Sequence, residues 1–132
     1  MHTITKFGAV FTALLALALS AHGAGAQVAT SDARAFLGEW EIAFQGERPF
    51  TLVLAIRDEN GRLAATANMM ESAAPVTTIQ RRETALVLSY TFNYQGQPVP
   101  ISVTLTPGQQ GVQASLTAAN GQYTAAGSAK KR

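Results

Sequence analysis

Hydrophobic and polar residues alternate with a period of two along most of the chain from residue 39 onward. Leu86, Leu88 and Tyr90, for example, are separated by the outward positions Val87 and Ser89. Such alternation is typical of β-strands that have one buried and one solvated face. The pattern predicts eight short strands, over residues 39–45, 50–57, 62–69, 76–82, 84–92, 99–106, 112–116 and 122–129.

Turn-forming residues separate these predicted strands. Asn60-Gly61 and Asn120-Gly121 are Asn-Gly pairs, which accept the positive φ angles of tight hairpin turns. Residues 70–75 are expected to form a loop, and the strand over 76–82 is the least clear because its apolar residues do not share one face. The order of strands and turns predicts an all-β fold, an eight-stranded antiparallel up-and-down barrel, since closure removes exposed sheet edges. An open sandwich of the same strands is the alternative.

The N-terminal residues 1–26 have the features of a signal peptide. Lys6 precedes an apolar run over residues 7–19, and small residues follow, ending in Ala24-Gly25-Ala26. We predict cleavage before Gln27 and a secreted or periplasmic protein. The apolar run is shorter than the roughly 20 residues that a spanning helix needs, so no membrane span is expected.

Two further regions complete the predicted organisation: a small, polar and mobile N-terminal segment over residues 27–35, and a β-barrel domain over residues 36–130. Within the first region, residues 31–37 are expected to form one short helical turn, with Ser31 or Asp32 as its cap.

Charge and composition narrow the possible functions. The chain has ten Lys and Arg and eight Asp and Glu, and loss of Lys6 with the signal peptide leaves a formal charge of +1. No basic stripe is present, so nucleic-acid binding is not expected. Both histidines, His2 and His22, lie in the signal peptide and the chain has no cysteine. His- or Cys-dependent catalysis and metal sites built on these residues are therefore excluded, and we expect a protein that is not an enzyme and has no cofactor.

The stretch Gly38-Glu39-Trp40 resembles the start of the lipocalin-like, or calycin, barrels, whose first strand opens with Gly-x-Trp after a short helical turn. The chain is most similar to short bacterial exported barrel domains of this kind, which end close to Thr-Gly-Thr-Arg. Here the corresponding residues are 126–130, Ala-Gly-Ser-Ala-Lys. The resemblance covers roughly residues 36–130 and implies a barrel that binds a small apolar molecule.

The resemblance also implies that the Trp packs inside one end of the barrel, beneath a basic residue of the last strand. Trp40 matches the first role. Ala129 stands where the basic residue is expected, and Lys130 is the first basic residue after it. Strict alternation would point Lys130 away from the ring, so a cation–π contact needs a bulge that re-aims this side chain.

The inward positions are nearly all apolar, so the interior is either filled by side chains or holds one small ligand. We predict an exported, non-enzymatic β-barrel that binds a small apolar ligand. The candidate ligand-binding residues are Trp40, Phe44, Leu54, Ala65, Ala67, Tyr90, Phe92 and Tyr123.

Two alternative functions are also compatible with the sequence. One is a filled barrel that serves as a scaffold or accessory domain for an envelope or secreted partner. It would have no cavity and would expose an apolar patch near Val53, Ala55 and Val87. The other is a small enzyme that shapes an apolar substrate, for which only Tyr90 and Tyr123 offer an interior polar group.

Overall fold

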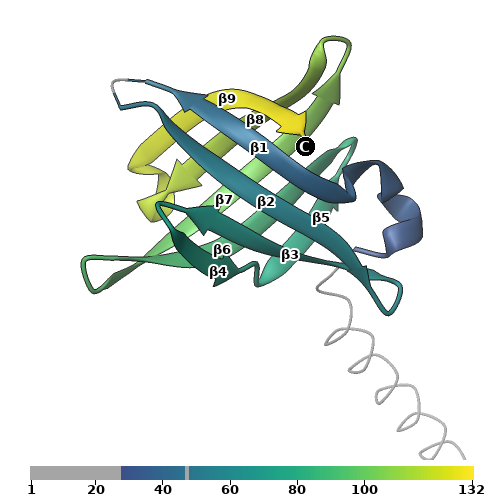
Figure 1. Ribbon diagram of the computed structural model, residues 1–132, viewed down its shortest axis with the longest axis horizontal. Helices are drawn as coiled ribbons and strands as arrows, with labels where there is room; N and C mark the ends of the chain where they lie inside the picture. The colour runs from purple at the N-terminus through teal and green to yellow at the C-terminus, as the bar shows by residue number, and fades with distance from the viewer. Residues whose placement is uncertain (1–27, 47) are drawn as a thin grey trace, which may run out of the picture.

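The structure, a computed structural model, describes residues 28–46 and 48–132, so the predicted signal peptide lies outside the described residues. The described part contains nine β-strands and three 3-10 turns, and no α-helix (Figure 1). The strands are β1 (Gly38–Gln45), β2 (Phe50–Glu59), β3 (Arg62–Met69), β4 (Ser72–Pro75), β5 (Thr78–Arg82), β6 (Ala85–Tyr94), β7 (Gln97–Gly108), β8 (Gly111–Ala118) and β9 (Tyr123–Lys131). The 3-10 turns are η1 (Thr30–Asp32), η2 (Arg34–Phe36) and η3 (Ala119–Gly121).

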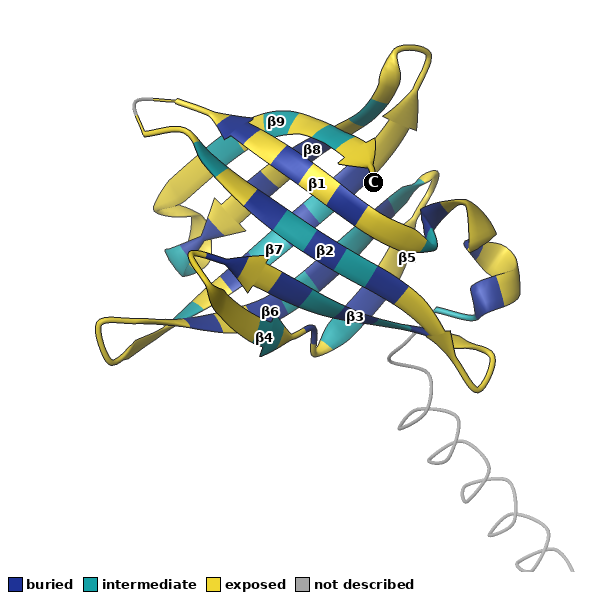
Figure 2. Ribbon diagram, viewed as in Figure 1, coloured by how far each residue is buried: buried dark blue, intermediate teal, exposed yellow. Residues whose placement is uncertain are grey.

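Burial along the strands follows the alternation in the sequence. In β1, Trp40, Ile42 and Phe44 are buried while Glu41 and Ala43 are exposed, and Figure 2 shows buried residues alternating mainly with half-buried ones along β2 and β3. The prediction of an all-β antiparallel fold is therefore confirmed. The hydrophobic effect selects this register because a shift by one residue would turn every apolar side chain outward.

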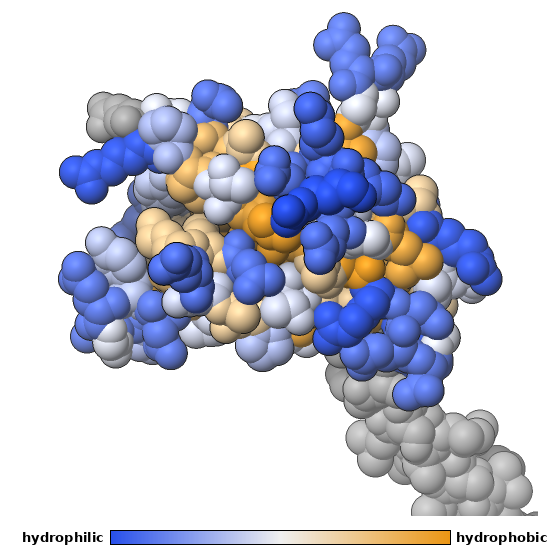
Figure 3. All heavy atoms as spheres, viewed as in Figure 1, coloured by the Kyte–Doolittle hydropathy of each residue, from blue (hydrophilic) through white to orange (hydrophobic). Residues whose placement is uncertain are grey.

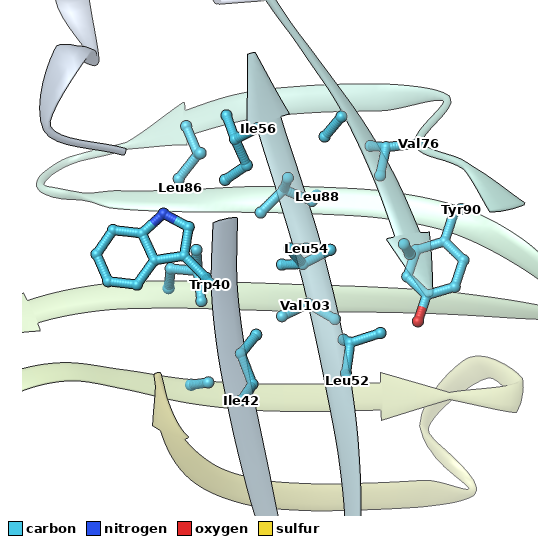
Figure 4. Close-up of a cluster of buried hydrophobic side chains, with 14 of the residues drawn as sticks. Trp40, Ile42, Leu52, Leu54, Ile56, Val76, Leu86, Leu88, Tyr90 and Val103 are labelled. Carbon is cyan, nitrogen blue, oxygen red and sulfur yellow. The ribbon is translucent and has the colours of Figure 1, made fainter. Parts of the chain in front are cut away.

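All nine strands belong to one antiparallel sheet, in the order β4-β3-β2-β1-β9-β8-β7-β6-β5. Strands β1 to β4 form one meander and β5 to β9 a second, and the pairing of β1 with β9 joins them. The sheet curls so that β2 and β3 lie in front of β6 and β7 (Figure 1). The core lies between these layers, where Leu54, Leu88 and Val103 are fully buried (Figure 4).

The predicted closure into a barrel is wrong, because β4 and β5 are the two free edges of the sheet. The predicted loop over residues 70–75 contains β4, and the strand predicted over 76–82 is reduced to β5. Strand β4 pairs with the second half of β3, whereas β5 pairs with the first half of β6. The chain thus changes its hydrogen-bonding partner between the two strands instead of continuing one ladder.

The change of partner takes place at Val76 and Thr77. The Val76 N–H donates to the Ala65 carbonyl at 2.9 Å, and the next N–H, of Thr77, donates to the Ser89 carbonyl at 2.8 Å. Pro75 ends β4, and proline has no N–H with which to extend a ladder. Two single hydrogen bonds to opposite neighbours therefore replace the continuous pairing that a closed barrel requires.

A glycine allows the close approach of β9 to β1 that joins the two meanders. Gly127 lies opposite Phe44 in the register. A Cβ atom at Gly127 would lie 2.1 Å from the Ala43 carbonyl oxygen, a distance at which atoms overlap. Any other residue would force the backbones of β1 and β9 apart.

Residues 28–36 cross one end of the curled sheet. The predicted single helical turn is instead the pair η1 and η2, and neither turn has a side-chain cap, so the expected capping by Ser31 or Asp32 is wrong. The Thr30 N–H donates to the Gly61 carbonyl at 2.9 Å, and on the other side Arg81 donates from Nη1 to the Asp32 carbonyl. The segment therefore bridges the β2–β3 hairpin and β5; its predicted mobility stays a prediction.

Candidate binding cavity

The two ends of the sheet differ, and we call them the closed end and the open end. At the closed end, the N-terminal turns place Ala33 and Phe36 in the core beside Trp40. The indole Nε1–H of Trp40 donates to the Phe36 carbonyl at 2.9 Å. Lys131 lies over the indole, with its Nζ 5.3 Å from the ring centroid, a cation–π distance. The N-terminal turns and Lys131 therefore cover this end of the core.

The cation over the indole is Lys131 and not Lys130, the residue singled out from the sequence. In the register of β1 and β9, Lys131 lies opposite Trp40 while Lys130 lies opposite Glu41. Gly38 has a φ of +120°, and a Cβ atom there would lie 3.1 Å from the Cε of Lys131. The glycine of the Gly-x-Trp motif thus adopts a backbone conformation that other residues avoid and leaves room for the lysine stem.

The open end holds a cavity of about 490 Å³. It lies where three turns meet, those joining β1 to β2, β3 to β4 and β6 to β7, together with η3. Its lining consists of Arg48, Pro49, Phe50, Met69, Met70, Phe92, Tyr94, Val99, Ile101, Leu116, Ala118, Ala119 and Tyr123. This volume is within the range of about 300–1,000 Å³ that is typical of small-molecule sites.

The lining becomes more polar from the floor to the mouth. The lining residues that are buried are all apolar, namely Met69, Phe92, Ile101, Leu116 and Ala118. The exposed lining residues at the mouth include two tyrosines and Arg48, which alone is charged among the lining residues that the structure describes. A ligand in this cavity would meet hydrocarbon at its inner end and hydrogen-bond donors at its outer end.

Exposed large hydrophobic side chains gather at this mouth. Among the described residues, three stand out: Met70 (65% exposed), Tyr94 (52%) and Tyr123 (49%). All three line the cavity, although they come from the β3–β4 turn, the end of β6 and the start of β9. Their convergence on one opening, instead of a scatter over the surface, is typical of a binding site.

The turn that carries Met70 is conformationally strained. Met70 and Glu71 form a two-residue hairpin turn between Met69 and Ser72, with φ angles of 51° and 64°. Both central residues of such a turn need positive φ, which Asn and Gly adopt readily and a long side chain such as Met does not. The fold thus holds an apolar side chain at the cavity mouth at a cost in backbone energy.

Tyr90 lies one layer below this lining, in the core. It is 3% exposed, and its ring lies at the opposite side of the buried cluster from Trp40 (Figure 4). Its hydroxyl is the one buried side-chain polar atom in the described residues that lacks a hydrogen-bond partner. Burial raises the pKa of Tyr90 from 10.0 to about 12, because the phenolate would lose its hydration.

The structure brings two of the eight candidate ligand-binding residues to the cavity. Phe92 contributes to the floor and Tyr123 to the mouth. The other six lie in the core outside the lining, namely Trp40, Phe44, Leu54, Ala65, Ala67 and Tyr90. Of these, Phe44 contacts the lining, since its ring stacks on that of the lining residue Phe50 with centroids 4.9 Å apart.

The remaining lining residues were not among those candidates. Tyr94 and Met70 lie in regions that the sequence assigns to connections between strands. Alternation predicts which side chains point inward only within strands, so it does not apply to these two residues. Arg48 lies in the turn between two predicted strands, next to Pro49, so alternation assigns it to neither face of the sheet. The sequence did contain one signal for these residues. Large apolar residues in short turns are unusual and indicate contact with something other than solvent.

The described residues contain no group of three or more His, Cys, Asp or Glu side chains arranged to hold a metal ion. In the same part of the chain, no helix has the length and hydrophobicity to cross a membrane. No family model, no curated protein and no solved structure matches this chain.

Proposed function

We propose that this chain is an exported, non-enzymatic binding protein whose curled β-sheet holds one small apolar ligand at its open end. The observation that carries the proposal is the cavity of about 490 Å³ with a buried apolar floor. The exposed side chains of Met70, Tyr94 and Tyr123 gather at the mouth of this cavity, which a purely structural end of a sheet does not require. Export rests on the signal-peptide pattern in residues 1–26.

The scaffold alternative has less support. It predicts a filled interior and an exposed apolar patch on the outer face around Val53, Ala55 and Val87. These three side chains are half-buried. On the face seen in Figure 3, hydrophobic colour shows in several areas, and polar side chains separate them. The cavity itself favours ligand binding.

Filling the cavity tests the proposal. The Ala118→Phe variant adds a ring at a buried position of the lining, and Ala126→Phe adds the same ring at an exposed position of β9. We expect the uncharged dye Nile red to bind the wild type and Ala126→Phe alike. Ala118→Phe should bind it at least about tenfold more weakly, a loss of about 1.4 kcal/mol.

Native mass spectrometry of protein purified from its own compartment provides the second arm of this test, because a bound apolar molecule would add a discrete mass. Circular dichroism and thermal unfolding confirm that both variants keep the fold. Failure of the wild type to bind Nile red, or equal binding by Ala118→Phe, would contradict the proposal.

A further inference from the structure

We infer that the ligand is amphipathic, with an anionic head group held at the mouth by Arg48 and an apolar body on the cavity floor. This inference rests on the proposed function and specifies the class of ligand. The floor residues Ile101, Leu116 and Ala118 are buried and offer no hydrogen bond from their side chains. A polar group would therefore be unfavourable at the inner end and must stay at the mouth.

The charges at the mouth decide the sign of the head group. Among the described residues of the lining, Arg48 alone is charged, and it makes no ion pair or side-chain hydrogen bond with any residue that the structure describes. Glu71 lies in the neighbouring turn but outside the lining. Guanidinium presents several N–H donors in one plane, which suits a carboxylate or phosphate with two oxygens.

Two tyrosines add donors beside this cation. Tyr94 and Tyr123 each combine an exposed position at the mouth with an apolar ring against the cavity. A phenol in such a position packs its ring on hydrocarbon while its O–H remains free to donate to an anion. The mouth therefore combines one positive charge and two hydroxyl donors around an apolar entrance.

Competition against Nile red with chains of equal length tests the inference. The competitors are dodecanoate, dodecyl phosphate, dodecanol and dodecylamine, each below its critical micelle concentration, at neutral pH and low salt. We expect the wild type to bind dodecanoate, dodecyl phosphate or both about threefold to tenfold more tightly than dodecanol, and dodecylamine least tightly. The relative affinities of carboxylate and phosphate distinguish the two kinds of head group.

Variants of Arg48 show whether this residue sets the preference. Arg48→Gln should remove the difference in affinity between the anions and dodecanol, and Arg48→Glu should make dodecylamine the strongest competitor. Arg34→Gln, which removes the same charge at an exposed position of the closed end, is the matched control and should behave as wild type. Added salt should reduce the preference, since the charges at the mouth are solvent-exposed.

The outcomes separate the two proposals. Equal affinity of the wild type for anion, alcohol and amine would overturn the anionic head group while leaving apolar binding in place. A preference that survives in Arg48→Gln would overturn the role of Arg48. If neither Nile red nor any competitor binds, the proposed function fails and the inference fails with it.

Discussion

The closed and open ends are built from the same nine strands, with the same alternation of buried and exposed residues, yet one end is covered and the other holds a cavity. The difference lies in what the rest of the chain adds at each end. At the closed end, η1 and η2 add Phe36 and Ala33 to the core, and the C-terminal residues add Lys131 above Trp40. At the open end, no segment of the described chain covers the floor, and the turns only surround it.

The two edge strands, β5 and β4, also differ between the closed end and the open end. At the closed end, β5 pairs with β6 from Arg82 to Thr78, and residue Ala29 forms a bridge with Arg62 of β3. At the open end, β4 pairs with β3 alone and lies near β6 without strand pairing. Backbone pairing and side chains thus cover the closed end. A curled sheet can therefore form a cavity at its other end without closing into a barrel.

Substitution of Trp40 gives the strongest test of the difference between the closed and open ends. We expect Trp40→Ala to lower the free energy of unfolding by about 4 kcal/mol, because the substitution leaves a large void in a filled region and orphans the Phe36 carbonyl. Urea denaturation followed by circular dichroism measures this loss. Folded Trp40→Ala should bind Nile red with wild-type affinity, because the indole does not line the cavity.

Tyr94→Ala at the open end is the matched comparison for Trp40→Ala. Tyr94 is exposed, so its truncation should cost less than about 1 kcal/mol of stability and should weaken Nile red binding instead. If Trp40→Ala weakened dye binding more than Tyr94→Ala did, in samples shown to be folded, the two ends would not be separable in function.

Tyr90 tests the boundary between the filled core and the cavity. Its pKa is raised from 10.0 to about 12 in the folded protein, so folding favours the neutral phenol. The neutral phenol of Tyr90 makes its full contribution to the free energy of unfolding below pH 10. About 2–3 kcal/mol of that free energy is lost in total as the pH rises through 12. At neutral pH, Tyr90→Phe should gain about 1 kcal/mol, because it removes a buried hydroxyl that has no partner.

Urea denaturation at a series of pH values compares the wild type with Tyr90→Phe. The variant's advantage should widen between pH 10 and 12, whereas Tyr123→Phe, altered at an exposed tyrosine, should follow the wild type. Parallel curves for the wild type and Tyr90→Phe would show that water or a partner reaches the Tyr90 hydroxyl, and that the cavity extends deeper into the core.

The strands could be predicted from the sequence because burial on alternate positions leaves a direct pattern. The predicted strand over 62–69 has the bounds of β3, and Asn60 and Gly61 have the positive φ angles expected of their turn. The absence of closure also had a visible sign in the sequence. Val76 and Ile79 do not share a face of one strand, and the structure explains this, since Val76 belongs to the link that bonds β3 and Ile79 to β5.

The cavity could not be predicted in the same way. Leu52 in the filled core and Leu116 on the cavity floor have the same alternating pattern, and only the tertiary arrangement decides which has a neighbour above it. The covering of the closed end was equally hidden, because residues 27–35 are mostly small or polar, a composition that favours a mobile segment. Contact between segments that lie far apart in sequence leaves no periodic signal.

Lys131 provides the most sensitive comparison at the closed end. We expect Lys131→Met to lower the free energy of unfolding by about 0.5–1 kcal/mol, because methionine keeps part of the apolar stem against Gly38 and loses the cation over the Trp40 ring. Lys130→Met is the matched control, since Lys130 is exposed on the opposite face of β9 and should cost less than about 0.5 kcal/mol. Thermal and urea unfolding measure both. A larger loss for Lys130→Met than for Lys131→Met would place the important cation one residue earlier and would contradict the register in which Lys131 faces Trp40.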